Sequence, residues 1–113
     1  MSLSPSIVVV LVTAPRGKGG EIARRLVEER LAACVNIVEA HSIYWWRGRV
    51  EEDDEDLLIV KTRLENLPKL VKRVKEIHPY EVPEIIAVPV IAGLRDYIDW
   101  VVEETGGGET KAK

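Results

Sequence analysis

The stretch that decides the fold is ACVNIVEAHSIYWWRGRVEEDDEDLLIVKTR, residues 33–63. It predicts a β-hairpin with arms at residues 34–46 and 50–62, joined at Arg47-Gly48-Arg49. Strands usually contain about 5–6 residues and rarely more than about 10, so both arms are longer than an ordinary sheet requires. The outer part of this hairpin must therefore extend beyond the sheet in which it begins.

Three consecutive aromatic residues, Tyr44, Trp45 and Trp46, lie on this outer part of the hairpin. Contiguous apolar patches that remain exposed on a folded chain usually mark an interface. We therefore expect an assembling protein, with these three side chains at the contact between copies and the function located where the copies meet.

The rest of the chain supplies the other elements of an α+β sandwich. Residues 7–12, IVVVLV, are typical of a central strand that is buried on both faces. Amphipathic spacing predicts helices at residues 21–33, 67–77 and 94–101, and residues 85–91 predict a strand that Pro89 places at an edge. The order β-α-β-β-α-β with an added C-terminal helix is the ferredoxin-like plan, in which both main helices cover one face of an antiparallel sheet.

Length and composition indicate one domain over residues 1–113, ordered from about residue 7 to residue 104, with a frayed tail after Gly106. The net charge of −3 gives no basic face for nucleic acid, and no apolar run is long enough for a membrane span. The first residues lack the basic region of a signal peptide, and Cys34 is the single cysteine, so we expect a cytoplasmic protein. The 31% charged residues and the absence of Gln favour a thermostable one.

Five motifs carry a resemblance to a known family: TAP at 13–15, LAACVN at 31–36, SIYWWRG at 42–48, IVKT at 59–62 and HPYEVPEI at 78–85. Together they resemble the CutA divalent-cation tolerance proteins, from about residue 7 to residue 103. The resemblance implies a ferredoxin-like homotrimer, with hairpins that reach neighbouring subunits, and an association with tolerance of copper and other divalent ions. It also implies a likeness to the PII nitrogen-signalling proteins, which rests on the fold alone.

The resemblance implies metal ligands that this chain keeps only in part. In copper-binding bacterial members the proposed ligands include a cysteine before the TAP motif and two histidines leading into HPY. Val12 and Ile77 occupy two of those positions here, and His78 occupies the third. Tight sites for such metals gather three or four N or S ligands, so we expect no required cofactor and only weak binding of Cu²⁺ or another divalent cation by His78 with Glu81 or Glu84. The alternative role of His78 is to end the preceding helix by bonding its last carbonyl groups.

Other candidate residues have structural explanations. Cys34 is expected to pack as a small hydrophobe, and His41 to lie on a strand surface without a partner at ligand spacing. The acidic run at residues 51–56, EEDDED, is expected to be a solvated edge that discourages sheet pairing, with a possible contact to Arg47 and Arg49 of a neighbouring subunit.

A ligand cleft between subunits is a further possibility, with Thr13, Trp46, Lys61 and Tyr80 as its residues. The Gly-rich loop at residues 13–20, TAPRGKGG, precedes a helix and offers backbone N–H groups to an anion. Lys61, His78, Tyr80 and Glu84 also suggest a general base with an electrophilic partner. No nucleophile elbow, P-loop or HExxH motif is present, so we expect no enzyme. Three functions stay open: a trimeric metal-binding or metal-tolerance protein, a PII-like sensor of a small anion, and a structural assembly module.

Overall fold

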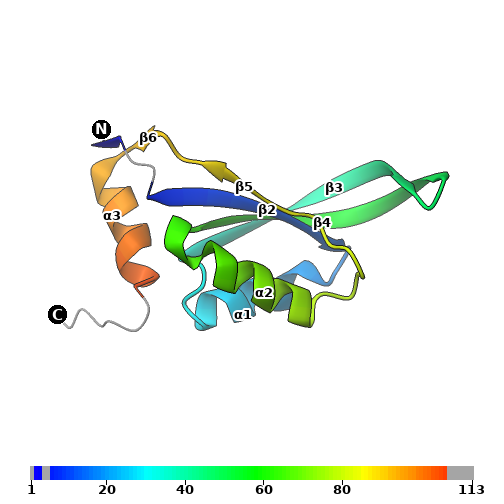
Figure 1. Ribbon diagram of the computed structural model, residues 1–113, viewed down its shortest axis with the longest axis horizontal. Coiled ribbons are helices and arrows are strands. Elements are labelled where there is room, and N and C mark those ends of the chain that lie inside the picture. Colours follow the sequence, from blue (N-terminus) through cyan, green and yellow to red (C-terminus); the bar gives the residue numbers. More distant parts are fainter. Residues whose placement is uncertain (1, 4–5, 107–113) are drawn as a thin grey trace.

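Four antiparallel strands form the main sheet, in the spatial order β3-β4-β2-β5. The computed structural model describes residues 2–3 and 6–106. The sheet strands are β2 (Ile7–Pro15), β3 (Cys34–Trp46), β4 (Arg49–Arg63) and β5 (Ile85–Pro89). Figure 1 shows α1 (Gly19–Glu28) and α2 (Leu67–Ile77) together beneath one face of this sheet. This arrangement confirms the ferredoxin-like prediction, with β2 central and β5 at an edge.

Smaller elements complete the described part of the chain. They are a two-stranded sheet of β1 (Ser2–Leu3) and β6 (Ala92–Gly93), the 3₁₀ turn η1 (Leu64–Asn66) and the helix α3 (Arg95–Glu104). The tail after Gly106, where fraying was expected, lies outside the described residues. None of the helices in residues 6–106 is long and apolar enough to cross a membrane.

The core lies between the sheet and the two main helices. Val10 and Val12 of β2 and Leu58 and Val60 of β4 have no exposed surface, and they pack with Ile22, Leu26, Leu70 and Val74 of the helices. Along β2 the even-numbered residues are buried while most odd-numbered ones are only partly covered, as the two-residue period of a strand requires.

Helix α1 is shorter than the predicted 21–33 and begins two residues earlier. Its first turn is stabilised by Asp56, whose Oδ2 accepts hydrogen bonds of 2.9 Å from the N–H groups of both Gly17 and Gly19. Arg30 ends the helical path because its φ of 63° lies in the left-handed region. The apolar pattern continues past this point because Leu31 and Ala32 still pack against the core.

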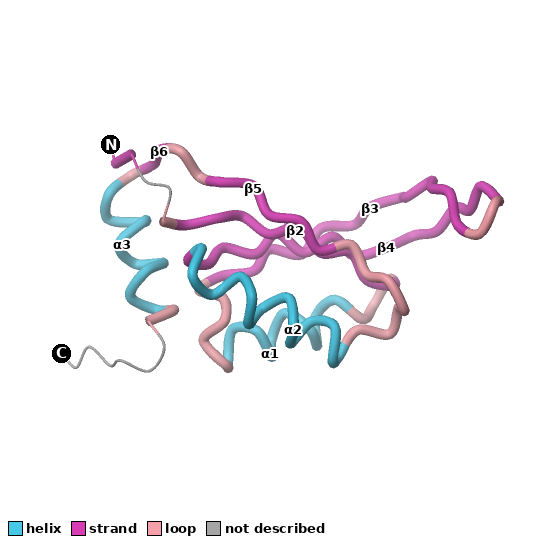
Figure 2. Tube along the Cα trace, viewed as in Figure 1, coloured by secondary structure: helices cyan, strands magenta, loops and turns pink. Residues whose placement is uncertain are grey.

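The hairpin of β3 and β4 pairs without interruption from Cys34↔Lys61 to Trp46↔Arg49. Its tip is a two-residue turn in which Arg47 and Gly48 have φ values of 52° and 79°. Positive φ at both positions is characteristic of the type I′ turn, which matches the twist of two paired strands. Figure 2 shows the outer half of the hairpin extending well beyond α1 and α2, so the predicted overhang is present.

Candidate functional site

A groove of about 790 Å³ lies between the outer hairpin and the loop at residues 79–84. Its lining residues come from three places in the sequence: Thr13 at the end of β2, residues 42–46 and Glu55 of the hairpin, and residues 79–84. No Lys or Arg is among these lining residues, whereas three of them, Glu55, Glu81 and Glu84, carry carboxylates. The groove is therefore acidic and aromatic.

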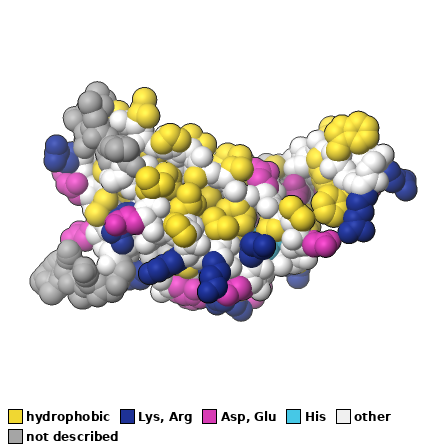
Figure 3. Space-filling model, in the orientation of Figure 1, with side chains coloured by type: hydrophobic (Ala, Val, Ile, Leu, Met, Phe, Trp, Pro, Cys, Tyr) yellow, Lys and Arg dark blue, Asp and Glu magenta, His cyan; other side chains and the backbone are white. Residues whose placement is uncertain are grey.

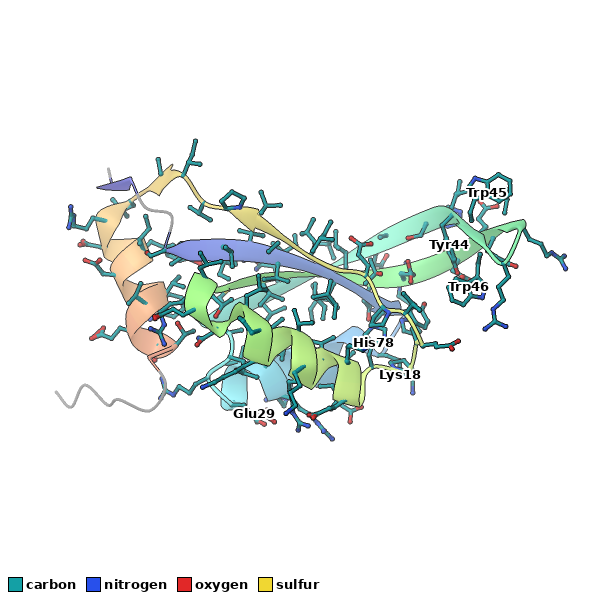
Figure 4. The ribbon with its side chains drawn as sticks, viewed as in Figure 1. Lys18, Glu29, Tyr44, Trp45, Trp46 and His78 are labelled. Carbon is teal, nitrogen blue, oxygen red and sulfur yellow. The ribbon has the colours of Figure 1, made fainter. Side chains whose placement is uncertain are left out.

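The alternation of β3 divides its aromatic residues between two sides of the hairpin. In the register of the ladder, Tyr44 and Trp46 lie on one side of the ribbon and Trp45 on the other. Figure 4 shows Trp46 and Trp45 on opposite sides of the ribbon, with Tyr44 and Trp46 on the side of the loop that follows His78. The side chain of Trp45 is the most exposed of the three, because the residue keeps 73% of its surface accessible.

Two tyrosines bind carboxylates in the wall of the groove. The hydroxyl of Tyr80 donates to Oε2 of Glu55 over 2.8 Å, and the hydroxyl of Tyr44 donates to Asp53. The hydrogen bond to Asp53 raises the pKa of Tyr44 to about 12. Burial, together with the hydrogen bond to Glu55, raises the pKa of Tyr80 well above its usual value. Both phenols therefore stay neutral. Tyr80 holds Glu55 of β4 against the loop, whereas Tyr44 bonds β3 to β4 within the hairpin.

His78 fixes the start of this loop through both of its ring nitrogens. Nδ1 accepts a hydrogen bond of 3.0 Å from the N–H group of Tyr80, so Nε2 carries the hydrogen and donates to the carbonyl oxygen of Thr13 over 2.7 Å. The residue is buried, at 8% exposure, and it ends α2 through its backbone N–H, which donates to the carbonyl oxygen of Val74. Its ring does not bond the last carbonyl groups of α2, contrary to the alternative role. Neither nitrogen has a lone pair left for a metal ion in this arrangement.

Of the predicted metal-binding residues, Glu81 and Glu84 line the groove, and His78 lies directly before its loop. Glu81 forms an ion pair of 3.1 Å with Arg47 at the hairpin tip, while Glu84 lines the groove. In the described part of the chain, no group of three or more His, Cys, Asp or Glu side chains is close enough to hold a metal ion. The predicted set of His78 with Glu81 or Glu84 therefore does not come together as a metal site within the described part of one chain.

Lys61 does not belong to the groove, contrary to its predicted place beside Thr13, Trp46 and Tyr80. Its Nζ donates to Oδ1 of Asn36 and lies 3.8 Å from Sγ of Cys34, near the far end of β4. It therefore cannot join His78, Tyr80 and Glu84 in a catalytic group either. Cys34 packs in this cluster and does not line the groove. Burial of the Tyr97 hydroxyl raises the pKa of Tyr97, and the neighbouring thiol of Cys34 raises it further.

The acidic run at residues 51–56 is only partly the solvated edge that was predicted. Glu55 and Asp56 are buried, at 5% and 7% exposure, because Glu55 binds Tyr80 and Asp56 caps α1. Oδ1 of Asp56 also lies 3.5 Å from Nε of Arg16. The backbone N–H groups of Gly17 and Gly19, which were offered to an anion, are thus already bound to a carboxylate of the same chain.

His41 lies on the strand surface as predicted, but it does have partners. Its Nε2 is 2.6 Å from Glu52 and its Nδ1 is 2.8 Å from Asp54, both across the ladder on β4. These two hydrogen bonds, the one to Glu52 first, raise the pKa of His41. Spacing along the sequence could not reveal this cluster, because its members face each other only once the register is fixed.

Comparison with known proteins places this architecture in one family. Residues 8–104 match the family model described as CutA1 divalent ion tolerance protein. The divalent-cation tolerance protein CutA of Thermus thermophilus is 57% identical over 100 residues, which is 87% of this chain and 97% of that protein. A solved structure of the Thermus protein has a TM-score of 0.86 at 56% identity, covering 88% of this chain and 99% of the other. The structure described as PII-like protein CutA from Nostoc sp. PCC 7120 in apo form has a TM-score of 0.84 at 43% identity and covers 87% and 96%.

The expectation of a cytoplasmic location is wrong as a property of such proteins. A similar protein of Arabidopsis thaliana is named chloroplastic; it is 45% identical over 89% of this chain, which spans 56% of its length. A structure from Archaeoglobus fulgidus, with a TM-score of 0.85 at 40% identity over 88% of this chain and 98% of its own, is described as periplasmic. The compartment therefore varies among relatives that share the fold. With the family model covering nearly all of the described residues and a relative above 50% identity along almost its whole length, this chain belongs to the CutA1 divalent ion tolerance family.

Proposed function

We propose that this protein is a non-catalytic homotrimer whose groove between the hairpin and residues 79–84 binds divalent cations. The observation that carries the proposal is the charge of the groove: Glu55, Glu81 and Glu84 line it, and no Lys or Arg does. A cation is attracted to such a surface and an anion is repelled by it. The names of the relatives, which refer to divalent-cation tolerance, support the same class of ligand.

Self-assembly is supported by the apolar side chains that a single chain leaves uncovered. Ile43, Trp45 and Val50 share one side of the outer hairpin and are 65%, 73% and 59% exposed. Figure 3 shows hydrophobic side chains gathered at the tip of the hairpin, remote from the helices. Exposed apolar patches of this kind normally mark protein contacts. Another copy of the chain carries the same patch, so self-association can cover both.

The nature of the carboxylate ligands favours hard cations. Carboxylate oxygens suit Mg²⁺, Ca²⁺ and Mn²⁺, whereas copper and zinc prefer imidazole and thiolate. The only cysteine is remote from the groove, and both nitrogens of His78 are engaged. Weak attraction of Mn²⁺ to the carboxylates that line the groove, Glu84 among them, is therefore better supported than copper binding at His78.

The second candidate, a sensor of a small anion, has less support. The amides of Gly17 and Gly19 are bound to Asp56, and Lys61 lies outside the groove. A purely structural module is the remaining alternative, and an empty result in the titration below would favour it.

Titration calorimetry tests the proposal. Mn²⁺ and Cu²⁺ are added to the wild type, to Glu84→Gln and to His78→Gln, a variant that retains a donor near the position of Nε2. We expect Mn²⁺ to give heat with the wild type and His78→Gln, and at least tenfold weaker binding with Glu84→Gln. Sedimentation of the same samples should show a trimer. Absence of Mn²⁺ binding, or binding lost only in His78→Gln, would contradict the cation assignment.

A further inference from the structure

Arg47 places an organic cation at the mouth of the groove. Its guanidinium carbon lies 5.2 Å from the centroid of the Trp46 ring, and its Nη2 donates to Oε1 of Glu81 over 3.1 Å. A flat cation is thus held between an aromatic ring and a carboxylate, which is the arrangement by which proteins recognise guanidinium and alkylammonium groups.

The interior of the groove repeats the same two kinds of side chain. Tyr44 and Tyr80 add aromatic surface, and Glu55 and Glu84 add negative charge, while no Lys or Arg competes from the lining. The volume of about 790 Å³ lies in the range of sites that enclose a small molecule. Because both tyrosines keep their protons, with the pKa of Tyr44 raised to about 12, they present neutral rings to a ligand.

The contact that Arg47 makes is weak enough to be replaced. The side chains of Arg47 and Glu81 are both 72% exposed, and ion pairs this exposed contribute little to stability. Arg47 also belongs to the two-residue turn, and its side chain is held there by Trp46 and Glu81. A second guanidinium with a tail inside the groove would gain the aromatic contacts that Arg47 cannot reach from the tip.

We propose that the groove binds a small guanidinium compound, whose head displaces Arg47 from between Trp46 and Glu81. A guanidinium placed between Trp46 and Glu81 stacks on the ring and donates to the carboxylate at the same time, as Arg47 does. The proposal rests on the groove being a cation site, as in the proposed function, and it requires no metal.

Calorimetry with a matched pair of ligands tests this directly. Arginine amide and citrulline amide have the same shape, but the second carries an uncharged urea group in place of the guanidinium. In buffer with EDTA, we expect arginine amide to bind the wild-type protein at least tenfold more tightly than citrulline amide. Trp46→Leu and Glu81→Gln should each lower the affinity for arginine amide about tenfold or more.

The variants Arg47→Ala and Arg49→Ala separate the internal competitor from its neighbour at the tip. Removing Arg47 frees the binding-competent state, so arginine amide should bind about fivefold more tightly. Arg49→Ala should leave its affinity unchanged. Equal binding of the two amides, no gain from Arg47→Ala, or a gain from Arg49→Ala instead would overturn the proposal.

Two further arms separate this inference from other outcomes. An acetyl-Gly-Arg-Gly amide peptide should bind more weakly than arginine amide, and the reverse order would overturn the assignment to a free small molecule. A parallel Mn²⁺ titration without EDTA reports on the proposed function by itself. If Mn²⁺ binds and arginine amide does not, only the guanidinium inference is contradicted. If arginine amide binds and Mn²⁺ does not, only the metal proposal is contradicted.

Discussion

The inner and outer halves of the hairpin share one ladder of backbone pairs but differ in what covers their side chains. Val60, in the inner half of β4, has no exposed surface, whereas Val50, ten residues earlier on the same face, is 59% exposed. Backbone pairing and a type I′ turn therefore suffice to define a long ribbon, and the helices decide which part of it is buried. Within the single chain, the apolar residues Ile43, Trp45 and Val50 of the outer half remain more than half exposed.

Replacement of Trp45 by Ser should give the largest effect if the outer half is an interface. Large aromatic residues at the centre of interfaces contribute about 3 kcal/mol or more to association. We expect Trp45→Ser to dissociate the trimer at micromolar concentration, and Trp46→Ser, on the groove side, to do so less. Sedimentation equilibrium of both variants checks this. A Trp45→Ser protein that stays trimeric after strong dilution would show that the apolar outer face has another purpose.

The pair Val60→Ala and Val50→Ala compares the two halves with the same chemical change. Val60→Ala removes two methyl groups from the closed core and should lower the free energy of unfolding by about 2.5 kcal/mol. Val50→Ala should lower the unfolding free energy of the dissociated chain by less than about 0.5 kcal/mol. Urea denaturation at low protein concentration measures both. Equal losses would mean that the outer half is already packed within one subunit.

Asp56 marks the boundary between the two halves, and its replacement tests how the inner half is closed. Asp56→Ala leaves the N–H groups of Gly17 and Gly19 without their acceptor, which should cost about 2 kcal/mol. Asp56→Asn keeps an acceptor oxygen and should recover part of this loss. Hydrogen exchange at the first turn of α1 locates the effect. Unchanged exchange there in Asp56→Ala would show that the cap does not stabilise the helix.

The smallest effect concerns the exposed cluster of His41, Glu52 and Asp54 on the outer half. Since the two carboxylates raise the pKa of His41 above its ordinary value of about 6.5, the folded protein holds this proton more tightly than the unfolded chain does. The stabilisation is complete below the unfolded pKa and is lost as the pH rises through the higher folded pKa. As the pH is raised above 6.5, the melting temperature of the wild type should therefore decrease by a small amount, and that of His41→Gln should not. An identical slope in both proteins would remove His41 from this account.

Most of the fold could be predicted from local patterns. Residues 7–12 and 67–77 carry unambiguous strand and helix periods, and the length of the hairpin is visible in the sequence itself. The end of α1 could not be predicted, because Arg30 adopts a left-handed conformation usually signalled by Gly, and Leu31 continues the apolar pattern. The single-domain organisation and the thermostability inferred from composition stay predictions.

The candidate site could be predicted from the sequence only in part. The motifs that contain Thr13, Trp46 and Tyr80 place these residues in one groove, but Lys61 lies six positions along β4 from Glu55, or about 20 Å at the rise of a strand. The cap by Asp56 and the two hydrogen bonds of His78 depend on contacts between remote segments. No spacing rule within one segment reports such contacts. The pattern of residues 51–56 therefore predicts a solvated edge, whereas Asp56 is buried and caps α1.

The alternation of side chains along β3 restricts how the sequence of this protein can evolve. Tyr44 and Trp46 lie on one side of the ribbon and Ile43 and Trp45 on the other, so a point substitution on one side leaves the side chains of the other side in place. Loss or gain of a single residue in the arm would exchange the two sets at one stroke. The length of β3 should therefore be more strongly constrained in evolution than the identity of any one residue on it.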